Sequence, residues 1–147
     1  MKKKSTFIII LLSILVIVLL LKFVVSQSQR STLQNTIDTS FKYQLSNVLG
    51  SFGNEVNDYT YRSMISSVYS VSVMSELTSF EDKNDDLDIS LNYLYVSLRE
   101  DKSKDKVLAR IEELREILFE MVQDPTSKEA TNKLIQIAND TFFKVKD

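Results

Sequence analysis

Hydrophobic residues form one continuous run near the start of the chain and recur at helical spacing in the rest. Every residue from Phe7 to Leu21 except Ser13 is aliphatic or aromatic, and three more hydrophobic residues follow Lys22. At about 1.5 Å per residue, a helix over residues 7–25 is about 28 Å long, which matches the hydrocarbon core of a bilayer. The run therefore predicts a transmembrane helix.

The stretch after residue 32 has hydrophobic residues at steps of three or four, the spacing of one face of a helix. They are Leu33, Ile37, Phe41, Leu45, Val48, Phe52, Val56 and Tyr59. Gly50 and Gly53 interrupt this stripe, and each costs about 1 kcal/mol relative to alanine inside a helix. The two glycines indicate a kink, or a place where another backbone approaches closely.

Residues 58–80 are rich in serine, tyrosine and β-branched residues, and part of the stretch alternates like a strand. We expect a helix, because Met64, Val68 and Val71 keep helical spacing and a single strand would have no partner for its hydrogen bonds. An acidic loop over residues 81–86 then precedes a helix that begins at Leu87. A charged link over residues 101–105 is expected to follow that helix.

Two further helices are indicated at the C-terminal end. Hydrophobic residues over 107–121 keep helical spacing, and Pro125 ends this helix because proline disfavours a helical residue before it. Thr126 and Glu129 form a capping-box pattern for the last helix, in which Glu129 lies one turn before Lys133. Burial of all the stripes together predicts an all-α protein, with a single N-terminal transmembrane helix followed by an antiparallel helical bundle of about four helices.

Positive charge around the hydrophobic run sets its expected orientation. Lys2, Lys3 and Lys4 precede the run, and Lys22 lies near its far end. Positive flanks stay in the cytosol, and a lysine near a helix end reaches the lipid headgroups. We expect a cytosolic N-terminus over 1–6, a signal-anchor helix over 7–25, a stalk over 26–32 and an extracytoplasmic helical domain over 33–147. The alternative is a signal peptide cleaved near Ser26, which would leave a secreted helical protein.

Composition narrows the chemistry that the chain can perform. Its 147 residues include no cysteine and no histidine. Disulfides, the usual zinc sites and mechanisms that depend on a thiol or an imidazole are therefore excluded. From Ser26 onward the chain has 14 basic and 20 acidic residues, a net charge of -6, which disfavours binding to nucleic acid. We expect no enzyme activity and no cofactor.

Oxygen-bearing side chains alternate in the acidic loop. Asp82, Asn84, Asp86 and Asp88 follow the spacing of the first ligands in a calcium-binding loop. An EF-hand also needs glycine at its sixth position and glutamate at its twelfth, where this chain has leucine and tyrosine. The alternative is a solvated loop that binds no metal. Its aspartates would then stabilise the N-terminus of the next helix.

Tyrosines supply the candidates for a partner interface, because aromatic residues are enriched where proteins bind one another. Tyr61 and Tyr95 fall off the hydrophobic stripes of their neighbours and are therefore expected on the surface. Packing within the domain is the alternative role for both.

These features favour a non-catalytic, single-pass membrane module that binds another membrane or envelope protein as an accessory or structural subunit. The second hypothesis is a ligand-sensing helical ectodomain that signals through a partner, which resembles in layout the ectodomains of bacterial chemoreceptors and sensor kinases. Such receptors carry a cytosolic output domain, whereas six residues precede this predicted anchor. An enzyme that acts on wall or lipid substrates with carboxylates alone is a minor alternative.

Overall fold

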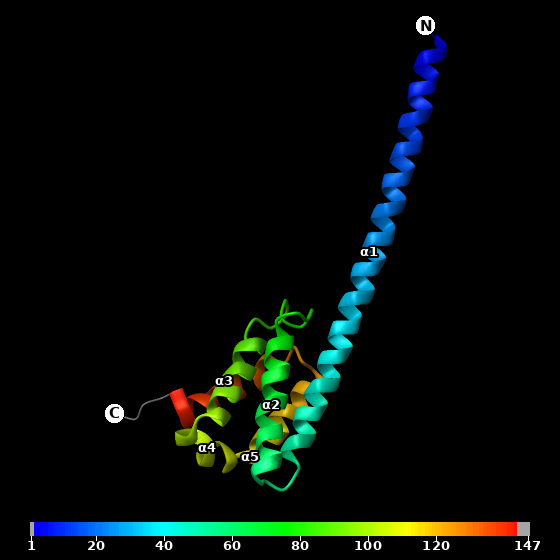
Figure 1. Ribbon diagram of the computed structural model, residues 1–147. Helices are drawn as coiled ribbons and strands as arrows, with labels where there is room; N and C mark the ends of the chain where they lie inside the picture. Colours follow the sequence, from blue (N-terminus) through cyan, green and yellow to red (C-terminus); the bar gives the residue numbers. More distant parts are fainter. Residues whose placement is uncertain (1, 144–147) are drawn as a thin grey trace. The chain divides into compact units, whose positions relative to one another are not determined.

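The computed structural model describes residues 2–143, and it describes the side chains of residue 12 and of residues 14–143. In this part of the chain all regular structure is helical, with six α-helices, one short π-helix and no strand, which confirms the all-α expectation. The chain forms two compact units, Met1–Thr36 and Ile37–Asp147, which divide the first helix between them. Figure 1 shows the order of the helices.

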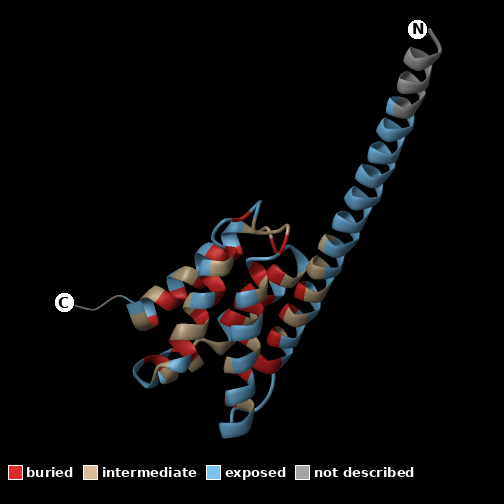
Figure 2. Cartoon of the chain, turned by 45° about the horizontal axis from the view of Figure 1, so that its top comes forward, coloured by how far each residue is buried: buried red, intermediate tan, exposed pale blue. Residues whose placement is uncertain are grey.

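The first unit is the N-terminal part of α1 (Lys2–Phe52), a helix of 51 residues. Residues 26–32, expected to form a stalk, belong to the same helix. The hydrophobic side chains of residues 14–25 are 44% to 65% exposed, and Figure 2 shows this stretch as exposed. By length and composition, this helix could cross a membrane. Lys22 is exposed within it, whereas the side chains of the lysines at positions 2–4 lie outside the described residues.

The second unit begins with the last turns of α1, which bury one face in the folded domain. The buried residues of this face are at most 2% exposed: Phe41, Leu45, Val48 and Phe52. This confirms the predicted stripe from Phe41 to Phe52. Its expected beginning at Leu33 is wrong, because Leu33 is 62% exposed. Its expected continuation through Val56 and Tyr59 is wrong, because α1 ends at Phe52 and Tyr59 is 82% exposed. The chain turns at Gly53, whose N–H donates to the carbonyl of Gly50 at 3.1 Å.

A new helix, α2 (Asp58–Ser75), begins after this turn with its own side-chain phase. The Asn57 side chain caps it by accepting hydrogen bonds from the backbone N–H groups of Tyr59 and Thr60, both at 3.0 Å. Its buried face then follows helical spacing: Tyr61, Met64, Val68 and Val71. The helical interpretation of this ambiguous stretch is confirmed, although α2 ends at Ser75 rather than near residue 80.

Turns connect α2 to α3 (Leu87–Arg99), in agreement with the loop expected over residues 81–86. Asn84 anchors this segment from inside, because its fully buried amide donates to the Ser127 carbonyl at 3.3 Å and lies 3.4 Å from the Thr131 hydroxyl. Asp38 of α1 accepts hydrogen bonds from the N–H and the hydroxyl of Ser79, at 2.9 and 2.6 Å. These hydrogen bonds join the segment between α2 and α3 to α1 and to the start of the last α-helix, which begins after Ser127.

The helix α4 (Asp101–Leu108) corrects the expected charged link over residues 101–105. Ser103 and Val107 are its buried residues, one turn apart. The Ser103 hydroxyl donates to the carbonyls of Ser97 and Glu100, at 2.7 and 3.0 Å, which ties α4 to the end of α3. Two buried positions, one of them a serine, are too few to produce the hydrophobic period that predicts a helix.

The chain continues with α5 (Ile111–Gln123), α6 (Lys128–Ala138) and a π-helical turn over Asn139–Phe143. α5 ends before Pro125, as expected. The cap of α6 is Ser127 and not Thr126, so the predicted capping box of Thr126 and Glu129 is wrong, because the third residue after Ser127 is Ala130, which has no side-chain acceptor. The Ser127 hydroxyl accepts a backbone N–H from the first turn of α6 at 3.2 Å. Glu129 and Lys133 form the expected ion pair at 2.6 Å.

Helices of the second unit enclose one hydrophobic core. α3 packs against both α2 and α6, and α5 packs against α6. The Tyr61 hydroxyl of α2 donates a hydrogen bond to the Leu98 carbonyl of α3, and the rings of Phe41 and Phe80 lie 5.9 Å apart. In Figure 2 the stretches coloured as buried lie among the helices of this unit.

Candidate functional site

The helices α2 and α3 carry hydrophobic side chains that the core does not cover. Tyr69 and Val73, one turn apart on α2, are 52% and 50% exposed, and Ile89 on α3 is 40% exposed. These residues and Tyr93 line a hollow of about 280 Å³. Its other lining residues are polar or acidic: Ser72, Glu76, Asp88 and Asn92. We name Tyr69, Val73, Ile89 and Tyr93 the α2–α3 face. Exposed hydrophobic surface with a polar edge is typical of a protein-binding site.

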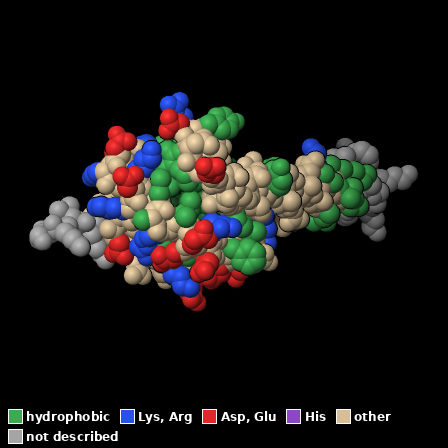
Figure 3. Space-filling view, turned by 90° about the horizontal axis from the view of Figure 1, so that it is seen from below, with side chains coloured by type: hydrophobic (Ala, Val, Ile, Leu, Met, Phe, Trp, Pro, Cys, Tyr) green, Lys and Arg blue, Asp and Glu red, His purple; other side chains and the backbone are tan. Residues whose placement is uncertain are grey.

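Exposed hydrophobic side chains also occur beside charged ones elsewhere on the domain. Figure 3 shows one side of it, where hydrophobic side chains lie between acidic and basic side chains. This side of the domain therefore carries both charges, despite the net negative charge of this part of the sequence.

The two tyrosines predicted as partner contacts lie in different environments. Tyr61 is 9% exposed, so its expected surface position is wrong. The reason is the break at Gly53, after which α2 begins a new phase that turns Tyr61 into the core. Tyr95 is half-buried, and its ring lies 5.0 Å from that of Tyr69 and 5.4 Å from the Arg99 guanidinium. Tyr95 therefore supports the exposed Tyr69, and a direct role in binding stays a prediction.

The four candidate calcium ligands do not come together. Asn84 is fully buried and turns toward α6, where the Thr131 hydroxyl lies 3.4 Å from its Oδ1, whereas Asp82 and Asp86 are exposed. Asp88 is half-buried near the start of α3. Within the described residues, no three His, Cys, Asp or Glu side chains are grouped so that they could hold a metal ion. Alternation along the sequence therefore does not produce a ring of oxygen ligands here.

Glu81 is the most strongly perturbed acid in the same loop. Its Oε2 accepts a hydrogen bond from the backbone N–H of Asp88 at 3.2 Å. Burial and the negative charges of Asp88 and Asp85 raise the pKa of Glu81 from 4.5 to about 7. Because the pKa in the folded state exceeds the ordinary value, the contribution of Glu81 to stability is present below about pH 4.5 and is lost as the pH rises through about 7.

Replacing Glu81 by glutamine is expected to make the domain more stable than the wild type above about pH 7, and by a smaller margin at about pH 4.5. Glutamine keeps an oxygen that can accept the hydrogen bond from the Asp88 N–H and removes the charge of this half-buried side chain. Urea unfolding of the full-length chain in detergent at both pH values measures the difference. Asp82→Asn is the control, since Asp82 is exposed in the same loop. An equal effect of Glu81→Gln at both pH values would contradict the raised pKa of Glu81.

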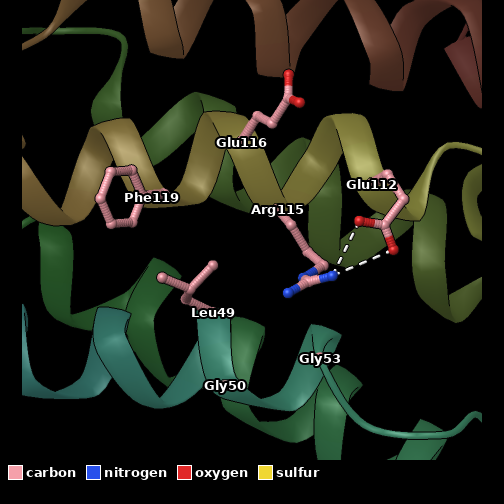
Figure 4. A pocket seen from close by; sticks show the side chains of 7 residues that line it. All are labelled: Leu49, Gly50, Gly53, Glu112, Arg115, Glu116 and Phe119. Carbon is pink, nitrogen blue, oxygen red and sulfur yellow. Dashed lines mark hydrogen bonds and ion pairs between the residues drawn. The ribbon is translucent and has the colours of Figure 1, made fainter.

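A second hollow, which the sequence does not predict, lies between the end of α1 and α5 and has a volume of about 480 Å³. We name it the α1–α5 groove. Its lining comes from α1, with Leu49, Gly50 and Gly53, and from α5, with Glu112, Arg115, Glu116 and Phe119. In Figure 4 the Arg115 guanidinium points from α5 toward Gly53, Leu49 points from α1 toward α5, and Glu116 points away from α1. Phe119 lies one turn after Arg115 on α5 and is 56% exposed.

Arg115 is the main polar group inside the groove. Its Nη1 donates to both carboxylate oxygens of Glu112, at 2.9 and 3.2 Å. Its Nε is buried and has no hydrogen-bond partner among the described residues, although the side chain as a whole is 43% exposed. A buried donor without an acceptor costs about 1–3 kcal/mol. The Nε is thus covered by the protein itself, and the exposed part of the guanidinium is what Arg115 presents to the groove.

Sequence reasoning missed Arg115 and Phe119 as site residues. Arg115 lies among several glutamates of α5, a pattern typical of an exposed helical face, and only its contact with the end of α1 distinguishes it. The two hollows each bring hydrophobic and charged side chains together. No protein-family model matches the chain, and no match was found among curated proteins or among solved structures.

Proposed function

We propose that this protein is a non-catalytic, membrane-anchored helical module that binds another membrane or envelope protein as an accessory or structural subunit. Residues 7–25 are the anchor, and the later helices form a binding domain outside the cytosol. Exposure of the hydrophobic side chains of residues 14–25 supports the anchor, because such a surface is unfavourable in water and favourable in lipid. The lysines at positions 2–4 support a cytosolic N-terminus.

The binding function rests on one observation, the exposed hydrophobic surface of the α2–α3 face. The opposite side of α2 already supplies Met64, Val68 and Val71 to the core. Tyr69 and Val73 therefore add apolar surface that the domain does not need for its own packing. Covering such surface is favourable by about 25 cal/mol per Å², so a partner that presents hydrophobic side chains here is favoured.

A photoreactive amino acid at position 73 tests this proposal in the cells that make the protein. With the reactive group in place of Val73, irradiation is expected to join the full-length chain to one discrete protein, identified by mass spectrometry as a membrane or envelope protein. Adding Ile89→Lys to the same chain is expected to abolish this product, because the substitution introduces a charge into the centre of the hydrophobic face.

The matched control carries the photoreactive group at Asn132, an exposed position on α6 outside the α2–α3 face. This position is expected to give only diffuse background. Equal products from positions 73 and 132, or no discrete product from position 73 in membranes where the chain is folded, would contradict the proposed binding face.

A further inference from the structure

The hollow of the α2–α3 face carries negative charge that its own lining does not balance. Glu76 caps the C-terminal end of α2, Asp88 lies in the first turn of α3, and both line the hollow. None of its described lining residues is a lysine or an arginine. Neither carboxylate forms a salt bridge with a described residue. The lining therefore has a net charge of -2, which favours a positively charged group.

Glu81, which contacts the start of α3 beside this hollow, adds to the negative field. Its Oε2 accepts a hydrogen bond from the backbone N–H of Asp88 at 3.2 Å. Burial, followed by the negative charge of Asp88, raises the pKa of Glu81 to about 7. A cation held next to Asp88 would reduce this repulsion between acids. The surroundings of the hollow therefore favour the same sign of charge as its lining.

Hydrogen-bond acceptors in the lining distinguish between the two basic side chains. Ser72 lines the hollow although it is only 6% exposed, and its hydroxyl forms no hydrogen bond with a described residue. Asn92 adds an amide oxygen from α3. A guanidinium has five N–H donors in one plane and no acceptor, whereas an ammonium is a compact charge with three donors. A lining with two carboxylates, a hydroxyl and an amide therefore suits arginine better than lysine.

The two tyrosines of the lining favour the same group. The Tyr69 ring lies 5.0 Å from the Tyr95 ring, and the Tyr93 ring lies 4.3 Å from the Phe143 ring, so both are supported by aromatic neighbours. A guanidinium stacks on aromatic faces more readily than an ammonium does. The guanidinium of Arg99 already lies 5.4 Å from the centre of the Tyr95 ring, outside the hollow. Aromatic surface at this face is therefore suited to a second guanidinium.

The volume of the hollow indicates how much of a partner can enter it. Sites for small molecules usually have volumes of about 300–1,000 Å³. This hollow has about 280 Å³, so it suits a single side chain. Val73 and Ile89, which are 50% and 40% exposed, also line it. A protein segment that carries a hydrophobic residue beside its arginine covers these two side chains as well, which a free cation does not.

We infer that the hollow of the α2–α3 face receives an arginine side chain of the partner protein. The guanidinium pairs with Glu76 and Asp88 and lies against the rings of Tyr69 and Tyr93, and a hydrophobic residue next to it in the partner covers Val73. This inference rests on the proposed function for the presence of a protein partner at this face. It deepens that function by naming the side chain through which the partner is recognised.

Fluorescein-labelled peptides test the inference with the full-length chain in lipid nanodiscs. Four peptides share a serine and alanine background and carry Leu-Arg, Leu-Lys, Leu-Gln or Leu-Glu at two central positions. Fluorescence anisotropy is expected to show saturable binding that is tightest for Leu-Arg, weaker for Leu-Lys and at least about tenfold weaker for Leu-Gln. Glu76→Lys is expected to weaken binding of Leu-Arg at least about tenfold and to make Leu-Glu the preferred peptide.

The position of Glu76 separates a loss of binding from a loss of folding. Glu76 is exposed at the C-terminal end of α2, where a positive charge is favourable because of the helix dipole. Glu76→Lys is therefore expected to melt at no lower temperature than the wild type while it loses the Leu-Arg peptide. Glu116→Lys is the matched control, since it makes the same change at an exposed glutamate of α5 outside this hollow. It is expected to leave the peptide preference unchanged.

Absence of saturable binding of the Leu-Arg peptide, equal binding of Leu-Arg and Leu-Gln, or equal effects of Glu76→Lys and Glu116→Lys would overturn the inference. These failures are distinguishable from failure of the proposed function. If crosslinking at position 73 gives a discrete product while the peptides show no preference for arginine, the partner binds this face through other groups and only the arginine is wrong. If the peptides bind as expected while crosslinking at position 73 fails, the hollow recognises arginine and the proposed function is wrong.

Discussion

Replacing Leu15 and Leu19 with arginine together is expected to release the chain from membranes. Both leucines lie near the middle of the proposed anchor and are more than half exposed on α1. Each arginine near the centre of a spanning helix costs roughly 3 kcal/mol in insertion, so the pair costs about 6 kcal/mol. Alkaline carbonate extraction of isolated membranes, followed by immunoblotting of pellet and supernatant, measures the change. The wild type is expected in the pellet and the variant in the supernatant.

Thr32→Arg combined with Thr36→Arg is the matched control for this substitution. Both threonines are exposed on α1 beyond the hydrophobic run, so two arginines there introduce the same charge without entering lipid. This variant is expected to stay in the membrane pellet. Retention of the Leu15→Arg, Leu19→Arg chain in the pellet would show that residues 7–25 do not provide the anchor.

Replacing Leu91 with alanine is expected to lower the free energy of unfolding of the domain by about 2–5 kcal/mol. Leu91 is fully buried on α3, the helix that packs against both α2 and α6. Removal of its methyl groups leaves a cavity that rigid neighbouring helices cannot close completely. The loss is a large share of the stability of a domain of this size. Urea unfolding of the full-length chain in detergent, followed by far-UV circular dichroism, measures it.

Ile89→Ala is the control, because Ile89 lies on the same helix and is 40% exposed. It removes a side chain of similar size where water already has access, so its effect is expected to be less than half that of Leu91→Ala. If both substitutions lowered stability equally, α3 would not occupy the place in the core that the structure gives it.

The sequence predicts the helices in which buried hydrophobic residues recur every three or four positions. Over Phe41–Phe52 and along α3 and α5, hydrophobic residues at steps of three and four coincide with the buried face, because a helix that packs on one side selects that spacing. α4 lacks this signal. Ser103 and Val107 are its buried residues, and the hydrogen bonds of Ser103 to the end of α3 hold it in place. A helix fixed by polar contacts with its neighbour is not visible in a hydrophobic pattern.

Helical phase is the second property that the sequence does not fix. A stripe that continues through Gly50 and Gly53 places Tyr59 inside and Tyr61 outside, which is the reverse of their positions in the structure. The Asn57 cap, with the Thr60 hydroxyl accepting from the Asn57 N–H at 2.8 Å, starts a new helix and resets the phase. The Asn-x-x-Thr pattern at residues 57–60 is the sequence signal for this restart.

The binding surfaces depend on contacts between distant residues, which one sequence does not reveal. The α1–α5 groove brings Gly50 and Arg115 together from separate helices, and the buried Asn84 meets Thr131 across 47 residues of sequence. The sequence indicates a kink or a close backbone approach at the two glycines, but a Cβ on Gly50 would meet no atom within 4 Å, so no other backbone approaches it closely. Only the fold shows that the guanidinium of Arg115, which follows ordinary exposed glutamates on α5, points toward Gly53.

Labelling of single cysteines tests the central claim, that the apolar helix holds the folded domain outside the cytosol. The chain contains no cysteine, so an introduced one gives the only thiol signal. Asn132→Cys reports on the exposed surface of α6, and Lys3→Cys reports on the N-terminus. With a membrane-impermeant maleimide applied to cells whose cytoplasmic membrane is intact, Asn132→Cys is expected to label before lysis and Lys3→Cys only after it. Labelling of Asn132→Cys only after lysis would contradict the account.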